Sequence, residues 1–111
     1  MPETLKKRRD FLAAARGRRI ARAAFVLQAL DRGDNGPARV GYTCSKKVGN
    51  AVARNRAKRR LREAARMIIP SNGRPGFDYV LIGRRNVTSE IGFADLCDEL
   101  QSSLEKVHQE S

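Results

Sequence analysis

A stretch of basic and small apolar residues at positions 46–66 constrains the fold of this chain more than any other segment. Its Ala, Arg, Lys and Leu residues favour helix, and Asn50, after the flexible Gly49, is suited to an N-cap. Placed at about 100° per residue, the apolar side chains share an arc of roughly 100°. They are Ala57, Leu61, Ala64, Ala65 and Ile68. The segment therefore predicts a long amphipathic helix with one face against a core.

Cations occupy most of the remaining circumference of this predicted helix. They are Arg54, Arg56, Lys58, Arg59, Arg60, Arg62 and Arg66. Arg54 shares the azimuth of the apolar stripe but lies about two turns before Leu61, so the first half of the helix is expected to overhang the core. Like charges at helical spacing repel one another, and cations are unfavourable at a helix start. We therefore expect an external anion to relieve the repulsion.

The charge of the whole chain also indicates a polyanionic partner, either nucleic acid or an anionic membrane surface. Its 23 Lys and Arg outnumber 12 Asp and Glu, for a net charge of +11. Residues 1–66 carry 19 basic and 5 acidic side chains (net +14), whereas residues 67–111 carry 4 and 7 (net −3). Of the 23 cations 17 are Arg, whose planar fork grips phosphate and stacks on bases, which favours structured nucleic acid. RNA is favoured over DNA, because neither helix-turn-helix spacing nor zipper heptads occur.

Length and composition exclude several other classes of protein. With 111 residues and 41% hydrophobic content, the chain predicts one folded domain, residues 1–111, and not a disordered basic tail. It has no apolar run of about 18 residues and no signal-peptide pattern, so no membrane partner and a cytoplasmic location are expected. The Arg-rich start resembles a mitochondrial transit peptide only faintly, because it lacks Ser and contains Glu3 and Asp10. Cys44 and Cys97 are expected to be free thiols.

No catalytic machinery is evident in the sequence, so no catalytic residue and no metal ligand is assigned. One His and two scattered Cys do not supply four metal ligands, and neither phosphate-binding glycine motif occurs. His108 falls near a terminus expected to fray, and Cys97 lies in an apolar helical stripe. Cys44 precedes two lysines that would lower a thiol pKa, but strand alternation favours its burial. A phosphodiesterase acting on its own would need a metal-carboxylate cluster that these residues do not form.

The other predicted elements are two helices and four strands. They are a helix at Arg8–Arg16, strands at Arg18–Arg22, Phe25–Leu30, Arg39–Ser45 and Phe77–Gly83, and a helix at Ser89–His108. The turn-forming residues 31–37 predict a hairpin between the second and third strands. The breaker cluster Pro70–Gly76 is expected to end the long helix. The two strands joined by that helix can be parallel neighbours.

Apolar positions predict which faces of these elements are buried. In the first helix they are Leu5, Phe11, Leu12 and Ala15. In the strand 39–45 they are Val40, Tyr42 and Cys44, and in the last helix Phe93, Leu96, Cys97, Leu100, Leu104 and Val107. Phe25 and Tyr79, inside apolar strands, are expected in the core. Phe11, in a charged segment, is also a candidate platform for a base.

The string from Ser45 to Ala64 closely resembles the signature of the bacterial ribonuclease P protein component. It combines a Lys-Lys-x-Gly-Asn-Ala-Val turn, starting at Lys46, with an Arg-Asn-Arg helix, starting at Arg54, that continues into Lys-Arg and a further Arg. The likeness extends over essentially the whole chain. It implies an α+β fold, a single-domain two-layer sandwich of order αβββαβα with a left-handed βαβ crossover. Spacing alone would predict the usual right-handed connection.

The resemblance also implies a division of labour. The RNA subunit, with bound Mg²⁺, cleaves precursor tRNA at the mature 5′ end, while the protein binds that RNA and the 5′ leader of the substrate. The matching positions that contact the RNA or lie beside the substrate are Lys46, Lys47, Asn50, Arg54, Asn55, Arg56, Lys58, Arg59, Arg60 and Arg62. The expected partners are therefore ribonuclease P RNA and precursor tRNA, with Mg²⁺ bound mainly by the RNA subunit and substrate. No obligate protein partner is evident.

By the same resemblance, Phe11, Gln28 and Tyr42 are assigned to the cleft that receives the leader. Family members often carry a second aromatic one turn after Phe11, where this chain has Ala14 and Ala15. Another aromatic is often found where this chain has Gln28. Base stacking is worth about 1–3 kcal/mol per base, so leader contacts are expected to be weaker or less sequence-selective. The alternative function is a ribosomal or general RNA-chaperone protein without a processing partner.

Overall fold

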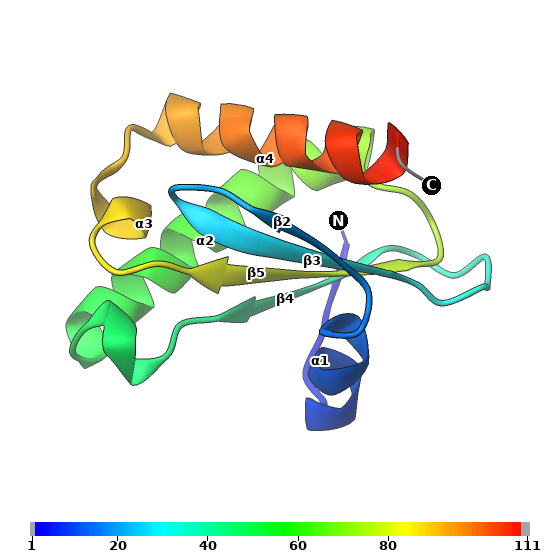
Figure 1. Cartoon of the computed structure of the whole chain (residues 1–111), viewed down its shortest axis with the longest axis horizontal. Helices are drawn as coiled ribbons and strands as arrows, with labels where there is room; N and C mark the ends of the chain where they lie inside the picture. Colours follow the sequence, from blue (N-terminus) through cyan, green and yellow to red (C-terminus); the bar gives the residue numbers. More distant parts are fainter. Residues whose placement is uncertain (1, 110–111) are drawn as a thin grey trace.

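The structure, a computed structural model, describes residues 2–109 as a five-stranded sheet with helices on both faces (Figure 1). In chain order the elements are β1 (Glu3–Thr4), α1 (Arg8–Ala14), β2 (Arg18–Ala21), β3 (Phe25–Asp31), β4 (Arg39–Thr43), the 3-10 turn η1 (Lys46–Val48), α2 (Ala51–Asn72), β5 (Phe77–Gly83), α3 (Val87–Glu90) and α4 (Phe93–Gln109). The long helices α2 and α4 cover one face, and α1 lies against part of the other. Apart from the short β1 and α3, this is the predicted order of helices and strands. Within the described range, no helix combines the length and apolar character that crossing a membrane requires.

The strand order is β1-β4-β5-β3-β2, which confirms one prediction about the sheet and overturns another. β4 and β5 are parallel neighbours, as predicted. The predicted hairpin between β3 and β4 is wrong, because β5 lies between them and pairs antiparallel with β3. Tyr79, Val80 and Leu81 of β5 are all buried, because the central position of this strand covers both of its faces. The turn at 31–37 therefore carries the chain across one strand.

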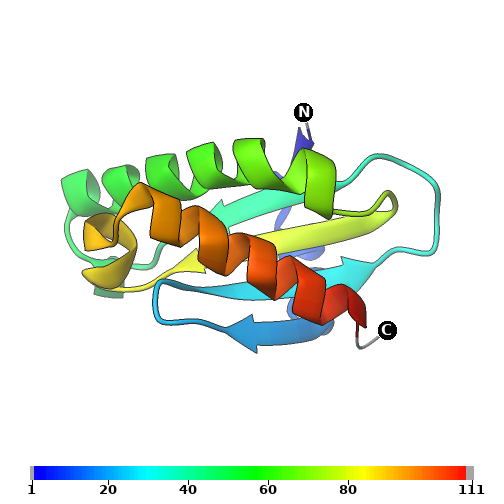
Figure 2. The same ribbon diagram turned by 90° about the horizontal axis from the view of Figure 1, so that it is seen from above.

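The connection from β4 through α2 to β5 is left-handed. In Figure 2 the helices lie in front of the sheet, both strands point to the left, and β5 lies below β4. When the strands are turned to point upward, β5 stands to the left of β4, the reverse of the usual crossover. The handedness implied by the family resemblance is confirmed.

Helix α2 begins and ends where its sequence predicts. The side-chain oxygen of Asn50 accepts a hydrogen bond from the Ala53 backbone N–H at 2.9 Å, the expected N-cap. The predicted breaker cluster Pro70–Gly76 does end the helix, which stops at Asn72, and Pro70 falls in its exposed last turn. The missing N–H of Pro70 removes only one bond there.

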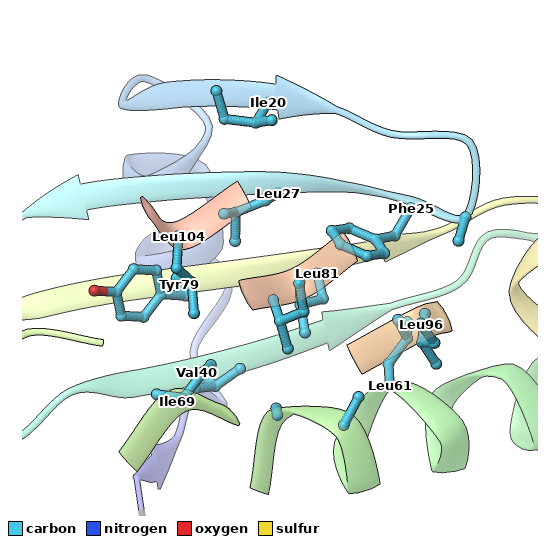
Figure 3. Packing of buried hydrophobic residues seen from close by; sticks show 14 of the residues in the cluster. Ile20, Phe25, Leu27, Val40, Leu61, Ile69, Tyr79, Leu81, Leu96 and Leu104 are labelled. Atoms are coloured by element: carbon cyan, nitrogen blue, oxygen red, sulfur yellow. The ribbon is translucent and has the colours of Figure 1, made fainter. Parts of the chain in front are cut away.

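The core lies between the sheet and the pair α2 and α4 (Figure 3). Phe25 and Tyr79 have no exposed surface, as predicted, and both cysteines are buried. The predicted stripe of α2 is buried except at its end, where Ile69 is enclosed and Ile68 is only half-buried. Figure 3 places Ile69 beside Val40, so the last turn of α2 presents that side chain to the sheet.

The last predicted helix is divided in two by a break at Ile91 and Gly92. The predicted α4 stripe is buried except for Phe93, which lies in the first turn after the break and is 36% exposed. The expectation of a frayed His108 is wrong. Its ring is buried, with Nε2 2.7 Å from the Tyr79 hydroxyl. Burial lowers the pKa of His108 and raises the pKa of Tyr79 to about 12.

Helix α1 buries a different side from the one predicted. Leu12 and Ala15 are exposed, whereas Ala14 is fully buried and packs in a small second cluster with Leu5. The reason is that α1 crosses the sheet with Phe11 lying over Gly41. A Cβ added at that glycine would stand 2.5 Å from Cε1 of Phe11, so the close approach requires glycine.

Candidate nucleic-acid interface

A sharp turn precedes α2 and exposes two of the predicted site residues. Lys46 and Lys47 lie in η1, whose start is capped by the Ser45 hydroxyl accepting from the Lys47 backbone N–H at 3.3 Å. Gly49 then adopts φ +147°, and a Cβ there would lie 2.9 Å from that of Ala53. Glycine thus allows the chain to turn directly from the two lysines into the helix.

Three cations form a row along one flank of α2, beside the free edge of β4. Arg54, Lys58 and Arg62 are spaced four residues apart, and none pairs with a carboxylate among residues 2–109. The Arg62 guanidinium carbon is 5.5 Å from the centroid of the Tyr42 ring. We call these three side chains the cation row. A row of unpaired cations at one helical spacing is suited to a phosphate backbone.

The atoms of the cation row lie partly against the protein. The Nε of Arg54 is buried and has no hydrogen-bond partner in the described part of the chain. Both Arg54 and Lys58 are close enough to Cys44 to favour its thiolate, yet burial dominates and raises the pKa of the thiol. Cys44 is therefore an inert core residue, as the alternation of its strand predicts.

On the opposite flank of α2, Arg56 and Arg60 line a hollow of about 810 Å³ facing residues 86–92. The guanidinium of Arg60 donates to the Thr88 carbonyl at 2.8 Å and to the Ile91 carbonyl. Arg60 is therefore bound to its own chain, as is Arg66, which pairs with Glu63. The other predicted cations of this helix form no ion pair or side-chain hydrogen bond with residues 2–109. Asn55 and Arg59 lie exposed on the outer side of α2.

The open face of the sheet holds a cleft of about 460 Å³ beneath α1. Its lining includes all three residues assigned to the leader cleft, Phe11, Gln28 and Tyr42. The strand register places Gln28 at the centre of the floor, between Arg19 of β2 and Val80 of β5. The structure thus brings together side chains that are far apart in the sequence.

Tyr42 connects the cleft to the cation row. Tyr42 is one of the residues that line the cleft, and its ring lies under Arg62. Burial raises the pKa of the Tyr42 hydroxyl, with Arg62 opposing the change. Because β1 pairs only with Arg39 and Val40, the edge of β4 at Tyr42 is left open between the two surfaces. Cleft and cation row therefore form one continuous surface.

A buried carboxylate that the sequence analysis missed holds α1 over the cleft. Asp78, 2% exposed, accepts hydrogen bonds from Arg39 at 2.8 and 2.7 Å and from Arg32 at 2.6 Å. Arg39 also reaches Asp10 of α1 at 3.7 Å. Burial alone would raise the pKa of Asp78, but the bonds from the two arginines outweigh it and the pKa is lowered. The only sequence feature that indicated a buried carboxylate was a single acid at the start of an apolar strand.

The described residues offer positioning groups and no grouped metal ligands. Between residues 2 and 109, no three His, Cys, Asp or Glu side chains gather closely enough to hold a metal ion. The cleft contributes the aromatic residues Phe11 and Tyr42 and the amide of Gln28, and the cation row contributes phosphate-binding groups. This arrangement can hold a polyanion in a fixed register.

The fold and the site define a small basic α+β protein with an unpaired cation row beside an open cleft. Comparison with known proteins gives one family within that class: the Ribonuclease P family model matches residues 1–108. The chain belongs to the ribonuclease P protein component family, and is thus a subunit of the tRNA-processing ribonucleoprotein nuclease.

Relatives and solved structures agree with this assignment. The ribonuclease P protein component of Ruegeria pomeroyi is 58% identical over 106 residues, covering 94% of this chain and 85% of that one. The component of Caulobacter vibrioides is 48% identical over 103 residues, covering 92% and 68%. Among solved structures, the RNase P protein from Thermotoga maritima superposes with a TM-score of 0.78 at 30% identity, covering 94% of this chain and 96% of that chain. That from Staphylococcus aureus gives 0.76 at 27% identity, with coverages of 95% and 94%.

Proposed function

We propose that this protein binds ribonuclease P RNA and the 5′ leader of precursor tRNA, and so assists Mg²⁺-dependent endonucleolytic removal of the leader. The observation that carries the proposal is the continuity of the cation row with the cleft through Tyr42. A single strand lying in the cleft passes directly to unpaired guanidinium and ammonium groups. Family membership supports the choice of RNA as the polyanion.

The contribution of the protein in this proposal is electrostatic positioning. The row from Arg54 to Arg62 spans about 12 Å along α2, at 1.5 Å of rise per residue. Its arginines bind phosphate oxygens with two donors each, which fixes orientation as well as charge. The Phe11 ring in the cleft provides a surface on which a base stacks. The Mg²⁺ ions are bound mainly by the RNA subunit and the substrate, and the bond is cleaved there.

Reconstituted cleavage tests this function. Purified protein alone should not cleave precursor tRNA at any Mg²⁺ concentration, and adding ribonuclease P RNA should give cleavage at low Mg²⁺. If about five phosphates are neutralised, the logarithm of RNA affinity should fall against the logarithm of salt concentration with a slope of roughly −3.5 to −4.5. Cleavage without RNA, after contaminating nucleases are removed, would contradict the non-catalytic role.

The RNA that copurifies with the protein separates this function from the alternative. One long structured RNA together with tRNA precursors supports the proposal. Ribosomal RNA alone would favour a ribosomal or RNA-chaperone role.

A further inference from the structure

A second hollow lies outside the cleft and is not explained by the positioning of a leader. It measures about 810 Å³ and separates the start of α2 from the segment that joins β5 to α4. Its lining residues are Val48, Asn50, Val52, Ala53, Arg56, Arg60, Asn86, Ser89, Glu90, Ile91 and Gly92. This volume falls within the range of about 300–1,000 Å³ typical of ligand pockets.

The far wall of this hollow is fixed before any ligand arrives. Arg60 binds the carbonyls of Thr88 and Ile91. The Thr88 hydroxyl, fully buried, donates to the Ala24 carbonyl and accepts from the Arg84 backbone N–H at 2.6 Å. The segment is thus tied to α2 on one side and to the sheet on the other. A preformed wall reduces the ordering cost of binding.

Two opposite charges line the hollow without pairing. Arg56 and Glu90 are both exposed, and neither forms an ion pair or a side-chain hydrogen bond with any residue from 2 to 109. Val52, 77% exposed, and Ile91 add apolar surface to the same lining. A ligand that fits this lining carries an anion, a flat apolar body and hydrogen-bond donors.

An unpaired guanine nucleotide has these three properties. Its phosphate would bind the guanidinium of Arg56, and its base would lie against Val52 and Ile91. An ionised carboxylate only accepts hydrogen bonds, and the Watson–Crick edge of guanine presents two neighbouring donors, N1–H and the N2 amino group. Adenine and cytosine present one donor next to an acceptor, which repels Glu90. Proteins read unstacked RNA bases on this edge.

We propose that the hollow between α2 and residues 86–92 receives one unpaired guanine nucleotide of ribonuclease P RNA, with Arg56 on the phosphate and Glu90 on the base. The inference rests on the proposed RNA-binding function. It adds a base-specific contact to the phosphate contacts proposed for the cation row.

Titration of the ¹⁵N-labelled protein with 5′-GMP, followed by amide chemical shifts, tests the site without any RNA. GMP should shift the amides of residues 50–53 and 89–92, and AMP and CMP should bind about tenfold more weakly, the effect of one charge-assisted hydrogen bond. Glu90→Gln should abolish the preference for GMP, and Arg56→Ala should weaken all three nucleotides. Glu105→Gln and Arg74→Ala, exposed side chains at the other end of the molecule, serve as matched controls.

The affinity for ribonuclease P RNA distinguishes an RNA nucleotide from a free one. Glu90→Gln should lower that affinity about tenfold with unchanged thermal unfolding. GMP binding with unchanged RNA affinity would overturn the proposal in favour of a free-nucleotide site. Equal response to the three nucleotides, or shifts confined to the cleft, would also overturn it. Failure of these titrations refutes only this inference, whereas failure of reconstituted cleavage refutes the proposed function.

Discussion

Two groups of arginines in this protein differ in what surrounds them. Arg32 and Arg39 each bind the buried carboxylate of Asp78, with donor–acceptor distances between 2.6 and 2.8 Å. Arg54 and Arg62 have no carboxylate partner in the described chain and belong to the row beside the open edge of β4. The net charge of +11 is therefore not one uniform field. Paired arginines hold the fold together, and unpaired ones are available to a polyanion.

Removing the shared carboxylate should produce the largest change. Asp78→Asn leaves Arg32 with only the exposed Asp34, and Arg39 with only Asp10 at 3.7 Å, as counter-charges. Breaking a buried pair costs about 3 kcal/mol. Chemical denaturation should show this loss in the free energy of unfolding. Asp95→Asn is the control, because Asp95 is exposed and forms no ion pair with residues 2–109, and it should change stability by less than about 0.5 kcal/mol. A stable Asp78→Asn protein would mean that α1 is held by packing alone.

Removing the cation row should weaken RNA binding and leave the stability of the fold unchanged. Replacing Arg54, Lys58 and Arg62 together with Ala should weaken RNA binding about 100-fold, at about 1 kcal/mol for each lost phosphate contact. The free energy of unfolding should not fall, because Ala favours helix and the row forms no ion pair. Filter binding and denaturation on the same samples provide both readouts. Global unfolding of the triple variant would show that the row is structural.

Local patterns predict the elements well, because their causes lie within a few residues. The Asn50 cap and the stripe through Leu61 depend on spacings of three or four positions, and both are confirmed. The order of the strands depends on the position of β5, which lies between β3 and β4. No sequence pattern near the turn at 31–37 indicates that position. The predicted hairpin fails for this reason.

Local patterns and long-range contacts also differ in what they reveal about the candidate site residues. In the sequence Arg60 looks like its neighbour Arg59, yet its carbonyl partners lie 28 and 31 residues away. Asp78 binds arginines 39 and 46 residues distant, and His108 is buried by a strand that ends 25 positions earlier in the chain. Contacts over such separations are set by the fold, so helical spacing alone assigns every cation of α2 the same role.

Arg60 and Arg59 provide a matched pair for testing that difference. Arg60→Ala removes two hydrogen bonds from a charged group and should cost about 1–2 kcal/mol of stability. Arg59→Ala should leave stability nearly unchanged and reduce the salt slope of RNA binding by about 1. Thermal unfolding and salt titration distinguish the two. If Arg60→Ala instead reduces the salt slope and leaves stability unchanged, Arg60 is a phosphate contact.

Acid should destabilise the protein by protonating Asp78, the carboxylate that Arg32 and Arg39 share. Because the folded pKa of Asp78 lies below its unfolded value, the unfolded chain binds the proton first as pH falls. Stability from Asp78 is therefore complete above about pH 4 and is lost as pH falls through the folded pKa, at no more than about 1.4 kcal/mol per pH unit. Denaturation at pH 5, 4 and 3 should show this loss in the native sequence and in the triple Ala variant. Asp78→Asn should lack most of it, and an unchanged acid response would assign it to other carboxylates.

Salt should have the smallest effect of these changes. It should stabilise the free protein by screening the cation row, and it should weaken RNA binding. Repulsion between exposed cations four residues apart costs about 0.2–0.5 kcal/mol per pair, and the Debye length falls from about 10 Å at 0.1 M to 3 Å at 1 M. Raising KCl over this range should therefore raise the melting temperature of the free protein by about 2 °C. The triple Ala variant should gain less, because two of these repulsive pairs are absent, and Asp78→Asn should gain as much as the native sequence. The same salt weakens RNA binding, since it competes for the charges whose repulsion it screens. A melting temperature that falls with KCl would show that ion pairs, and not unpaired cations, dominate the surface.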